Sequence, residues 1–254
     1  MTPDPTRLLL LGGTTESLAL AERLTTDPRL AVITSLAGRT VAHRLPPGEL
    51  RVGGFGGTGG LVAYLRAQAI GLVVDATHPF AATISGHAAE ACREAGLPRL
   101  QLLRPAWTPA AGDRWHEVAD TAAAAAALPA LGRTIFLAVG RQDLGPFATL
   151  TGRLRLIARM IEPQRLPGFE VILARGPFTP ADEAALFERA AIDVVVSKNS
   201  GGEASWAKIA AARTCGLPVV MIRRPPPEAG DRAADLKTAL AWVQARLDHP
   251  PGSA

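Results

Sequence analysis

Short apolar runs alternate with longer amphipathic stretches along almost the whole chain. The apolar runs are expected to form strands at residues 7–11, 30–35, 49–53, 72–76, 99–103, 115–118, 134–139, 154–160, 170–174, 193–197 and 218–222. The amphipathic stretches are expected to form helices at residues 15–26, 59–69, 80–95, 120–130, 180–190, 203–215 and 231–247. Alternation of this kind predicts βαβ units, and therefore an α/β fold with mainly parallel sheets.

An internal repeat divides this pattern into two halves. The stretch from Val73 to Pro105 and the stretch from Val195 to Pro225 both run strand, polar loop, helix, Gly-Leu-Pro, strand, Arg-Pro. Common ancestry and shared α/β construction both explain such a repeat. We predict two Rossmann-like domains, residues 1–118 and 119–254, with a cleft between them. The polar loops should face this cleft, since ligands bind beyond the carboxyl ends of parallel strands.

The first expected strand is followed by the turn Gly12-Gly13-Thr14-Thr15-Glu16. In a parallel α/β domain this is the place of the first phosphate-binding loop, where a helix N-terminus stabilises a diphosphate. The glycines let the backbone approach a ligand, and Thr14 or Thr15 can cap the helix or contact a phosphate oxygen. The loop is not a full G-x-G-x-x-G, so a purely steric glycine turn is the alternative.

The second expected strand indicates which dinucleotide this loop would bind. NAD-binding folds carry an acid near the end of this strand, but no acid occurs here between Asp27 and Glu49. Ser35, Arg39 and Arg44 are available instead. An arginine binds a 2′-phosphate that an acid would repel, so we predict NADPH rather than NADH. The alternative for Arg39 is an ordinary exposed loop arginine.

Composition limits the remaining classes of function. The chain has 254 residues, 48% of them apolar, and a net charge of +4. We find no apolar run of transmembrane length and no secretory signal, and we expect a cytoplasmic protein. The arginines are scattered and aromatic residues are few, which disfavours nucleic-acid binding. Cys92 and Cys215 have no metal-ligand spacing, so we expect two small buried helix residues and no metal site.

Five motifs occur in order along the chain: Gly12-Gly13-Thr14-Thr15-Glu16, Val74-Asp75-Ala76-Thr77-His78-Pro79-Phe80-Ala81, Arg104-Pro105-Ala106-Trp107, Arg175-Gly176-Pro177-Phe178 and Ser197-Lys198-Asn199-Ser200-Gly201-Gly202. In this order they resemble a known family, the precorrin-6A reductases of cobalamin (corrin-ring) biosynthesis. The resemblance covers about residues 7–225. It implies an oxidoreductase that uses NADPH to reduce one double bond of the precorrin-6A macrocycle, giving precorrin-6B. It also implies an anionic tetrapyrrole-derived substrate and an active site between two α/β domains.

Two other functions remain open on the sequence. One is the reduction of cobalt-precorrin-6A in the route that inserts cobalt early. The other is a non-catalytic dinucleotide-binding sensor on the same scaffold. The oligomeric state is not readable from the sequence.

The loop after the strand at 193–197 is the best candidate for substrate contact. Lys198 is expected to bind a substrate carboxylate or to donate the proton, and Asn199 supplies further donors. Ser200, Gly201 and Gly202 complete this substrate-binding loop, where backbone N–H groups can approach a ligand. The alternative is that a serine caps the next helix while Lys198 points to solvent.

Other candidates lie at the ends of neighbouring strands. Arg141 is expected to pair with a substrate carboxylate, or else to be a surface arginine beside Asp143. Thr77 and His78 are expected to contact the cofactor, although Asp75 or Thr77 could instead cap a helix that Pro79 starts. Gly53 and Gly54 are expected to touch the adenosine half of the cofactor. The proton source stays open among Lys198, His78, water and the acid groups of the substrate.

Replacement of Arg39 by alanine tests the predicted preference for NADPH. The Michaelis constant for NADPH should rise about tenfold or more, because a charge-assisted hydrogen bond contributes roughly 1.5–3 kcal/mol. The constant for NADH should change little. Steady-state kinetics with each cofactor measures both, and equal effects on the two would contradict the assignment.

Overall fold

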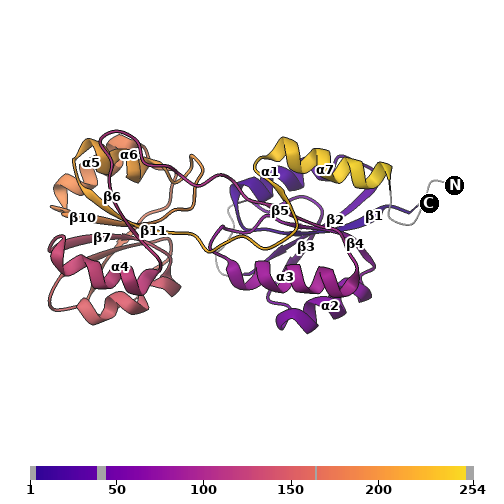
Figure 1. Ribbon diagram of the computed structural model, residues 1–254, viewed down its shortest axis with the longest axis horizontal. Coiled ribbons are helices and arrows are strands. Elements are labelled where there is room, and N and C mark those ends of the chain that lie inside the picture. The colour runs from indigo at the N-terminus through magenta and orange to yellow at the C-terminus, as the bar shows by residue number, and fades with distance from the viewer. Residues whose placement is uncertain (1–3, 39–43, 164, 250–254) are drawn as a thin grey trace. The chain divides into compact units, whose positions relative to one another are not determined.

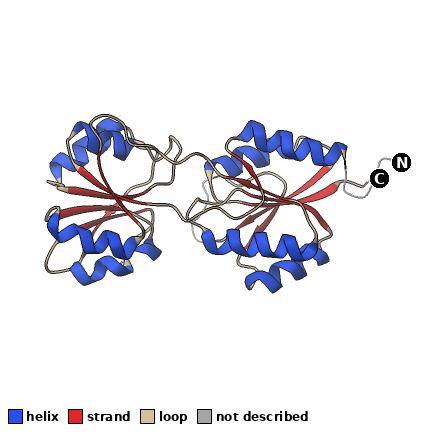
Figure 2. Cartoon of the chain, in the orientation of Figure 1, coloured by secondary structure: helices blue, strands red, loops and turns tan. Residues whose placement is uncertain are grey.

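The computed structural model describes residues 4–38, 44–163 and 165–249. Its chain forms two compact units, one made of Met1–Arg104 with Pro225–Ala254 and the other of Pro105–Arg224. Each unit contains a six-stranded sheet whose neighbouring strands are all parallel, with helices on both faces (Figures 1 and 2). The predicted α/β, Rossmann-like fold class is therefore confirmed.

The first unit has the strand order β12-β5-β4-β1-β2-β3. Helices α1 and α7 pack together on one face of this sheet, and α2 and α3 pack together on the other (Figure 1). The chain runs outward from β1 in one direction and from β4 in the other, so the carboxyl ends of β1 and β4 form the topological switch point. The strands are β1 (Thr6–Leu11), β2 (Leu30–Leu36), β3 (Glu49–Val52), β4 (Ile70–Asp75), β5 (Arg99–Leu102) and β12 (Asp231–Ala233); the helices are α1 (Thr15–Leu24), α2 (Gly57–Ala67), α3 (Ala82–Ala95) and α7 (Leu236–Asp248).

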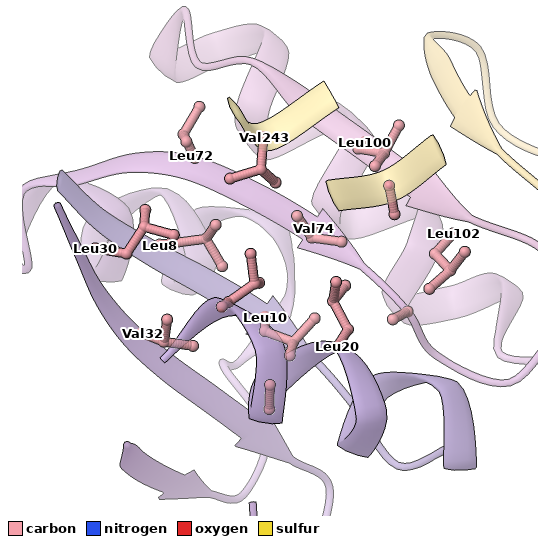
Figure 3. Packing of buried hydrophobic residues seen from close by; sticks show 14 of the residues in the cluster. Leu8, Leu10, Leu20, Leu30, Val32, Leu72, Val74, Leu100, Leu102 and Val243 are labelled. Carbon is pink, nitrogen blue, oxygen red and sulfur yellow. The ribbon is translucent and has the colours of Figure 1, made fainter. Parts of the chain in front are cut away.

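The run Leu8–Leu11 forms the centre of this unit because successive strand residues point to opposite faces. Leu8 and Leu10 pack with Leu20 of α1 and Val243 of α7 (Figure 3). Leu9 and Leu11 pack on the other face, against α2 and α3. All four leucines are at most 2% exposed, which explains why this strand is apolar at every position.

The second unit has the order β6-β11-β10-β7-β8-β9, with its switch point between β7 and β10. Helices α5 and α6 pack together, and α4 packs with the 3₁₀ segment η3. Phe136 of β7 and Phe187 of α5 are fully buried in the core. The strands are β6 (Arg114–Val118), β7 (Thr134–Ala138), β8 (Arg155–Met160), β9 (Phe169–Leu173), β10 (Val194–Lys198) and β11 (Pro218–Ile222); the helices are α4 (Thr121–Ala127), η1 (Leu128–Ala130), η2 (Arg141–Asp143), η3 (Gly145–Leu150), α5 (Pro180–Arg189) and α6 (Ala207–Thr214).

The predicted division of the chain at residue 118 is wrong, because two edge strands are exchanged. Strand β6 follows β5 in sequence but pairs with β11 in the second sheet. Strand β12 follows β11 in sequence but pairs with β5 in the first sheet. The chain changes unit after Arg104 and again after Arg224. Each of these two boundaries falls within one of the Arg-Pro pairs that end the two copies of the internal repeat.

The expected helix at 231–247 is also corrected. Residues Asp231–Ala233 form β12, and α7 begins only at Leu236. Asp235 is the N-cap of α7, because its carboxylate accepts a hydrogen bond from the Thr238 N–H at 2.8 Å. A three-residue polar edge strand gives too weak a pattern to separate from a helix start. No helix in the described part of the chain is both long and apolar enough to cross a membrane.

Candidate functional site

The loop after β1 is tied to the loop after β4 at the switch point of the first sheet. The Thr14 hydroxyl caps α1 by accepting the Ser17 N–H at 3.0 Å, and it donates to the Ala76 carbonyl oxygen at 2.8 Å. The Ser17 hydroxyl in turn accepts the N–H groups of Gly13 and Thr14, each at 3.0 Å. Thr14 therefore has the capping role that was one of its two predicted alternatives.

Two donors of the first turn of α1 remain available. The first N–H groups of a helix have no intrahelical acceptor, and hydroxyls take those of Thr14 and Ser17. This leaves the N–H groups of Thr15 and Glu16. Gly13 beside them is exposed, with φ of 112°, and a Cβ there would meet no described atom within 4 Å. The open side of this turn can accommodate an anion.

Gly12 has a different reason to be glycine. A Cβ at this position would lie 3.1 Å from the Ser17 hydroxyl oxygen and 3.3 Å from side-chain atoms of Thr34 and Leu36. Its N–H donates to the Ser35 carbonyl oxygen at 2.9 Å. Gly12 is thus needed for close packing at the end of the strand.

Glu16 is paired with an arginine that the sequence analysis did not select. Arg104 Nη1 lies 2.8 Å from Glu16 Oε2, and the arginine side chain is 17% exposed. An unpaired carboxylate in this turn would repel a phosphate, and the guanidinium offsets its charge. The recurrence of Arg-Pro at the end of both repeats was the signal that could have found Arg104.

The loop after β4 is organised by a buried carboxylate. Asp75 is 1% exposed, and its Oδ1 accepts the Thr77 N–H at 3.1 Å and the Thr77 hydroxyl at 2.7 Å. His78 is exposed, and its Nδ1 accepts the Phe80 N–H at 3.2 Å. Thr77 and His78 therefore follow the end of β4 at the switch point, with Thr77 held by Asp75, and their contact with a cofactor stays a prediction.

The helix that follows does not use these residues as caps. Its N-cap is Ala81, which makes no side-chain capping hydrogen bond, and α3 begins at Ala82. The alternative in which Asp75 or Thr77 caps this helix and Pro79 starts it is wrong. The Asp75 carboxylate instead accepts hydrogen bonds from Thr77 within the loop.

The residues expected around the second strand are only partly described. Ser35 is 6% exposed at the end of β2. Arg39 lies outside the described residues. Arg44 forms an ion pair with Glu22 at 2.8 Å.

Arg51 of β3 holds the neighbouring glycine loop, a role that the sequence analysis missed. Its guanidinium donates to the carbonyl oxygens of Gly53 at 2.5 Å and Gly54 at 2.7 Å, and it lies 3.7 Å from the Phe55 ring centroid. The same group is 3.4 Å from the Ser35 hydroxyl. A Cβ at Gly53 or Gly54 would meet no described atom within 4 Å, so both glycines border open space.

In the second unit the predicted residues lie at the carboxyl end of β10 and in the segment after β7. Lys198 Nζ donates to Asp143 Oδ2 at 2.5 Å, and the two side chains are 18% and 26% exposed. Lys198 thus does not simply point to solvent. The structure brings it together with Asp143 of η2, whereas Arg141 is exposed and makes no ion pair with any described residue.

Asn199 and Gly201 have clear structural roles in the same loop. The Asn199 amide accepts the Trp107 N–H at 2.8 Å and donates to the Trp107 carbonyl oxygen at 3.0 Å. Gly201 is buried, and a Cβ there would lie 2.0 Å from the Pro105 carbonyl oxygen. The Gly202 carbonyl oxygen accepts the Trp107 indole N–H at 3.0 Å. These contacts attach the loop to the segment Pro105–Trp107, an arrangement that sequence spacing does not reveal.

Ser200 does not cap α6. It is 6% exposed, and its hydroxyl lies 3.3 Å from the Ser205 hydroxyl. The N-cap of α6 is Trp206, with no side-chain capping hydrogen bond. Capping is therefore not the reason for a serine at this position.

Both cysteines are free thiols. Cys92 is buried in α3 as expected, and burial raises its pKa to about 11. Cys215 is only half-buried and is the C-cap of α6, which corrects the expectation that both are buried. Within the described ranges, no three His, Cys, Asp or Glu side chains are grouped to hold a metal ion.

The two parallel sheets and the glycine turn at the first switch point define the class: a protein with two Rossmann-like units. The chain belongs to the family described as Precorrin-6x reductase CbiJ/CobK, whose model matches residues 7–244. The resemblance drawn from the five motifs is thereby confirmed.

Individual relatives agree with this membership. A curated precorrin-6A reductase of Rhodococcus erythropolis is 49% identical over 242 residues, covering 94% of this chain and 97% of the relative. A cobalt-precorrin-6A reductase of Salmonella typhimurium is 29% identical over 252 residues, covering 92% and 94% of the two chains. A solved structure described as CobK precorrin-6A reductase superposes with a TM-score of 0.87 at 41% identity, covering 98% of this chain and all of the other.

Replacement of Asn199 by alanine tests the structural role of its amide. The change leaves the Trp107 N–H and carbonyl oxygen without these partners, which should lower the free energy of unfolding by about 1–3 kcal/mol. Urea unfolding followed by tryptophan fluorescence measures the loss. Arg141→Ala, at an exposed position, is the control and should stay within about 0.5 kcal/mol of the parent. An equally small effect of Asn199→Ala would contradict the assignment.

Proposed function

We propose that this chain catalyses the NADPH-dependent reduction of one double bond of precorrin-6A, giving precorrin-6B. The observation that carries the proposal is similarity along the whole chain to curated precorrin-6A reductases, 49% identical in Rhodococcus erythropolis and 45% in Mycobacterium tuberculosis H37Rv. Identity to the curated cobalt-precorrin-6A reductase of Salmonella typhimurium is 29%. This difference favours the metal-free macrocycle as substrate.

The first unit fits a dinucleotide on its own structural evidence. The backbone N–H groups of Thr15 and Glu16, in the first turn of α1, are available to an anion. The Arg104 guanidinium offsets the charge of the Glu16 carboxylate beside them. Gly13, Gly53 and Gly54 border open space, so a ligand can approach their backbone. Binding of the diphosphate and of the adenosine half of a dinucleotide requires these features.

The residues of this unit can be assigned to the parts of NADPH. The turn from Gly12 to Glu16 would hold the diphosphate. Ser35, Arg39, Gly53 and Gly54 would hold the adenosine half, with Arg39 on the 2′-phosphate. Thr77 and His78 would contact the nicotinamide half. Bound NADPH supplies a hydride to one carbon of the macrocycle.

Lys198 is the proposed substrate contact of the second unit. Its ammonium is oriented by Asp143 at the end of β10, where ligands of parallel sheets bind. An ammonium there can hold a substrate carboxylate, or it can give a proton to the carbon next to the one that receives the hydride. Asn199, Gly201 and Gly202 support it by holding the loop in place, while Ser200 and the exposed Arg141 remain proposed substrate contacts.

An assay of NADPH oxidation tests the proposed reaction directly. Addition of precorrin-6A to enzyme and NADPH should lower the absorbance of the reduced nicotinamide, with NADH a poorer donor. Cobalt-precorrin-6A measured side by side should be reduced more slowly. No loss of absorbance with either macrocycle would overturn the proposal, and faster turnover of the cobalt form would replace its substrate.

Replacement of Lys198 by methionine tests the proposed contact. Loss of a general acid should lower kcat by about 100-fold, whereas loss of a carboxylate contact should raise KM for precorrin-6A by about tenfold with kcat retained. Lys237→Met, at an exposed position of α7, is the matched control and should change neither constant. Unchanged kcat and KM in Lys198→Met would remove this residue from the site.

A further inference from the structure

The second unit contains a pocket that the residues discussed so far do not explain. Its volume is about 190 Å³. It opens between the end of β8 and the beginnings of α5 and α6, and therefore at the carboxyl edge of the sheet. Its lining residues are Arg159, Gly176, Phe178, Glu183, Ala204, Ser205, Ala207 and Lys208.

One side of this pocket carries a neutralised pair of charges. Arg159 Nη1 and Nη2 donate to the two carboxylate oxygens of Glu183 at 3.0 and 2.8 Å. The Glu183 side chain is 2% exposed, and the Arg159 guanidinium also lies 4.0 Å from the Phe178 ring centroid. This two-pronged pair satisfies both partners, so it adds no net charge to the pocket.

Lys208 at the start of α6 is a buried cation in excess of this pair. The residue is 7% exposed, its Nζ donates to the Ser205 carbonyl oxygen at 2.6 Å, and the Trp107 ring centroid lies 5.2 Å away. No carboxylate of the described residues lies within the 4.0 Å of an ion pair. An ammonium has three donors, so the carbonyl and the ring leave it short of acceptors.

The charged groups that face Lys208 explain how its charge is held. The pKa of Lys208 is lowered to about 8, chiefly by burial and also by the nearby charge of Arg159 of β8, while Glu183 of α5 acts in the opposite direction. Around neutral pH the side chain is therefore mostly a buried cation. An unpaired buried charge is costly, and a buried charged side chain that lines a cleft is therefore a candidate functional group.

We propose that this pocket binds one carboxylate side arm of the substrate, with Lys208 as its counter-ion. This inference rests on the proposed function, which supplies a macrocycle bearing several carboxylates. The volume suits a short acid arm and is too small for the ring system. The single excess positive charge matches one carboxylate, whereas a phosphate dianion would stay half-neutralised. The ring of Phe178 and the methyl groups of Ala204 and Ala207 contact the methylene groups of the arm.

Carbon-13 NMR of the lysine Cε atoms tests the pocket without relying on turnover. The chain has three lysines, Lys198, Lys208 and Lys237, so each signal can be assigned from single Lys→Met variants. Propionate, the smallest model of an acid arm, should shift the Lys208 signal and raise its titration midpoint by about one pH unit. The Lys237 signal should not respond. A Lys208 signal that ignores saturating propionate would overturn the proposal, whether or not the protein reduces precorrin-6A.

Kinetics of Lys208→Met extends the test to the substrate. KM for precorrin-6A should rise about tenfold, with KM for NADPH unchanged, and Lys237→Met should match the parent. In the parent, KM for precorrin-6A should rise as the pH passes above about 8, because the free ammonium loses its proton there. This rise should be absent in Lys208→Met. An unchanged KM for precorrin-6A in Lys208→Met would overturn the assignment of Lys208. If the parent protein itself does not oxidise NADPH when precorrin-6A is added, only the proposed function is overturned.

Discussion

The coverage of the central strands on both faces is the constraint on which the rest of this structure depends. Leu8–Leu11 of β1 and Val194–Val196 of β10 are almost wholly removed from solvent, which favours an apolar side chain at every one of these positions. Their backbone groups are satisfied only by parallel neighbours. Polar chemistry is thereby confined to the strand ends, where the Gly12 turn, the Thr77 loop and the Lys198 loop are found.

The two copies of the internal repeat solve the same local problem with different groups. After β4, the Asp75 carboxylate holds the backbone and hydroxyl of Thr77, so the loop is braced from within its own segment. After β10, the Asn199 amide pairs with both backbone groups of Trp107, so the loop is braced by a segment 92 residues away. The second arrangement holds the backbone next to Lys198 in place, with the lysine ammonium beside Asp143. A charged side chain needs such support if it is to bind a ligand in one geometry.

Sequence patterns predict the parts of this fold that depend on local physics. Long apolar runs and the glycine turn with its Thr14 cap can be read from neighbouring residues, and these elements are confirmed. The suggested caps at Asp75 or Thr77 and at the serine of the Lys198 loop are not found. The exchange of β6 and β12 cannot be read in this way, because both strands are short and largely exposed, and their partners are distant in sequence. The site divides similarly. The positions of Thr77 and Lys198 follow from where strands end, whereas the Asn199–Trp107 pairing and the Arg104–Glu16 ion pair are tertiary contacts. Lys208 shows the limit best, since a lysine near the start of an amphipathic helix has the same sequence pattern whether it faces solvent or a buried pocket.

The exchange of edge strands has a consequence for the order in which the protein can be built on the ribosome. The second unit is continuous in sequence, from Pro105 to Arg224, and all six of its strands have been synthesised before residue 225 is added. The first unit is begun earlier yet is completed last, because β5 has no neighbour on its outer edge until Asp231–Ala233 arrive. The face that α7 covers stays open for the same period, with Leu8, Leu10 and Val74 beneath it. The nascent chain thus carries an unfinished Rossmann-like sheet, with an unpaired edge at β5 that can pair with other strands, throughout synthesis of its second half.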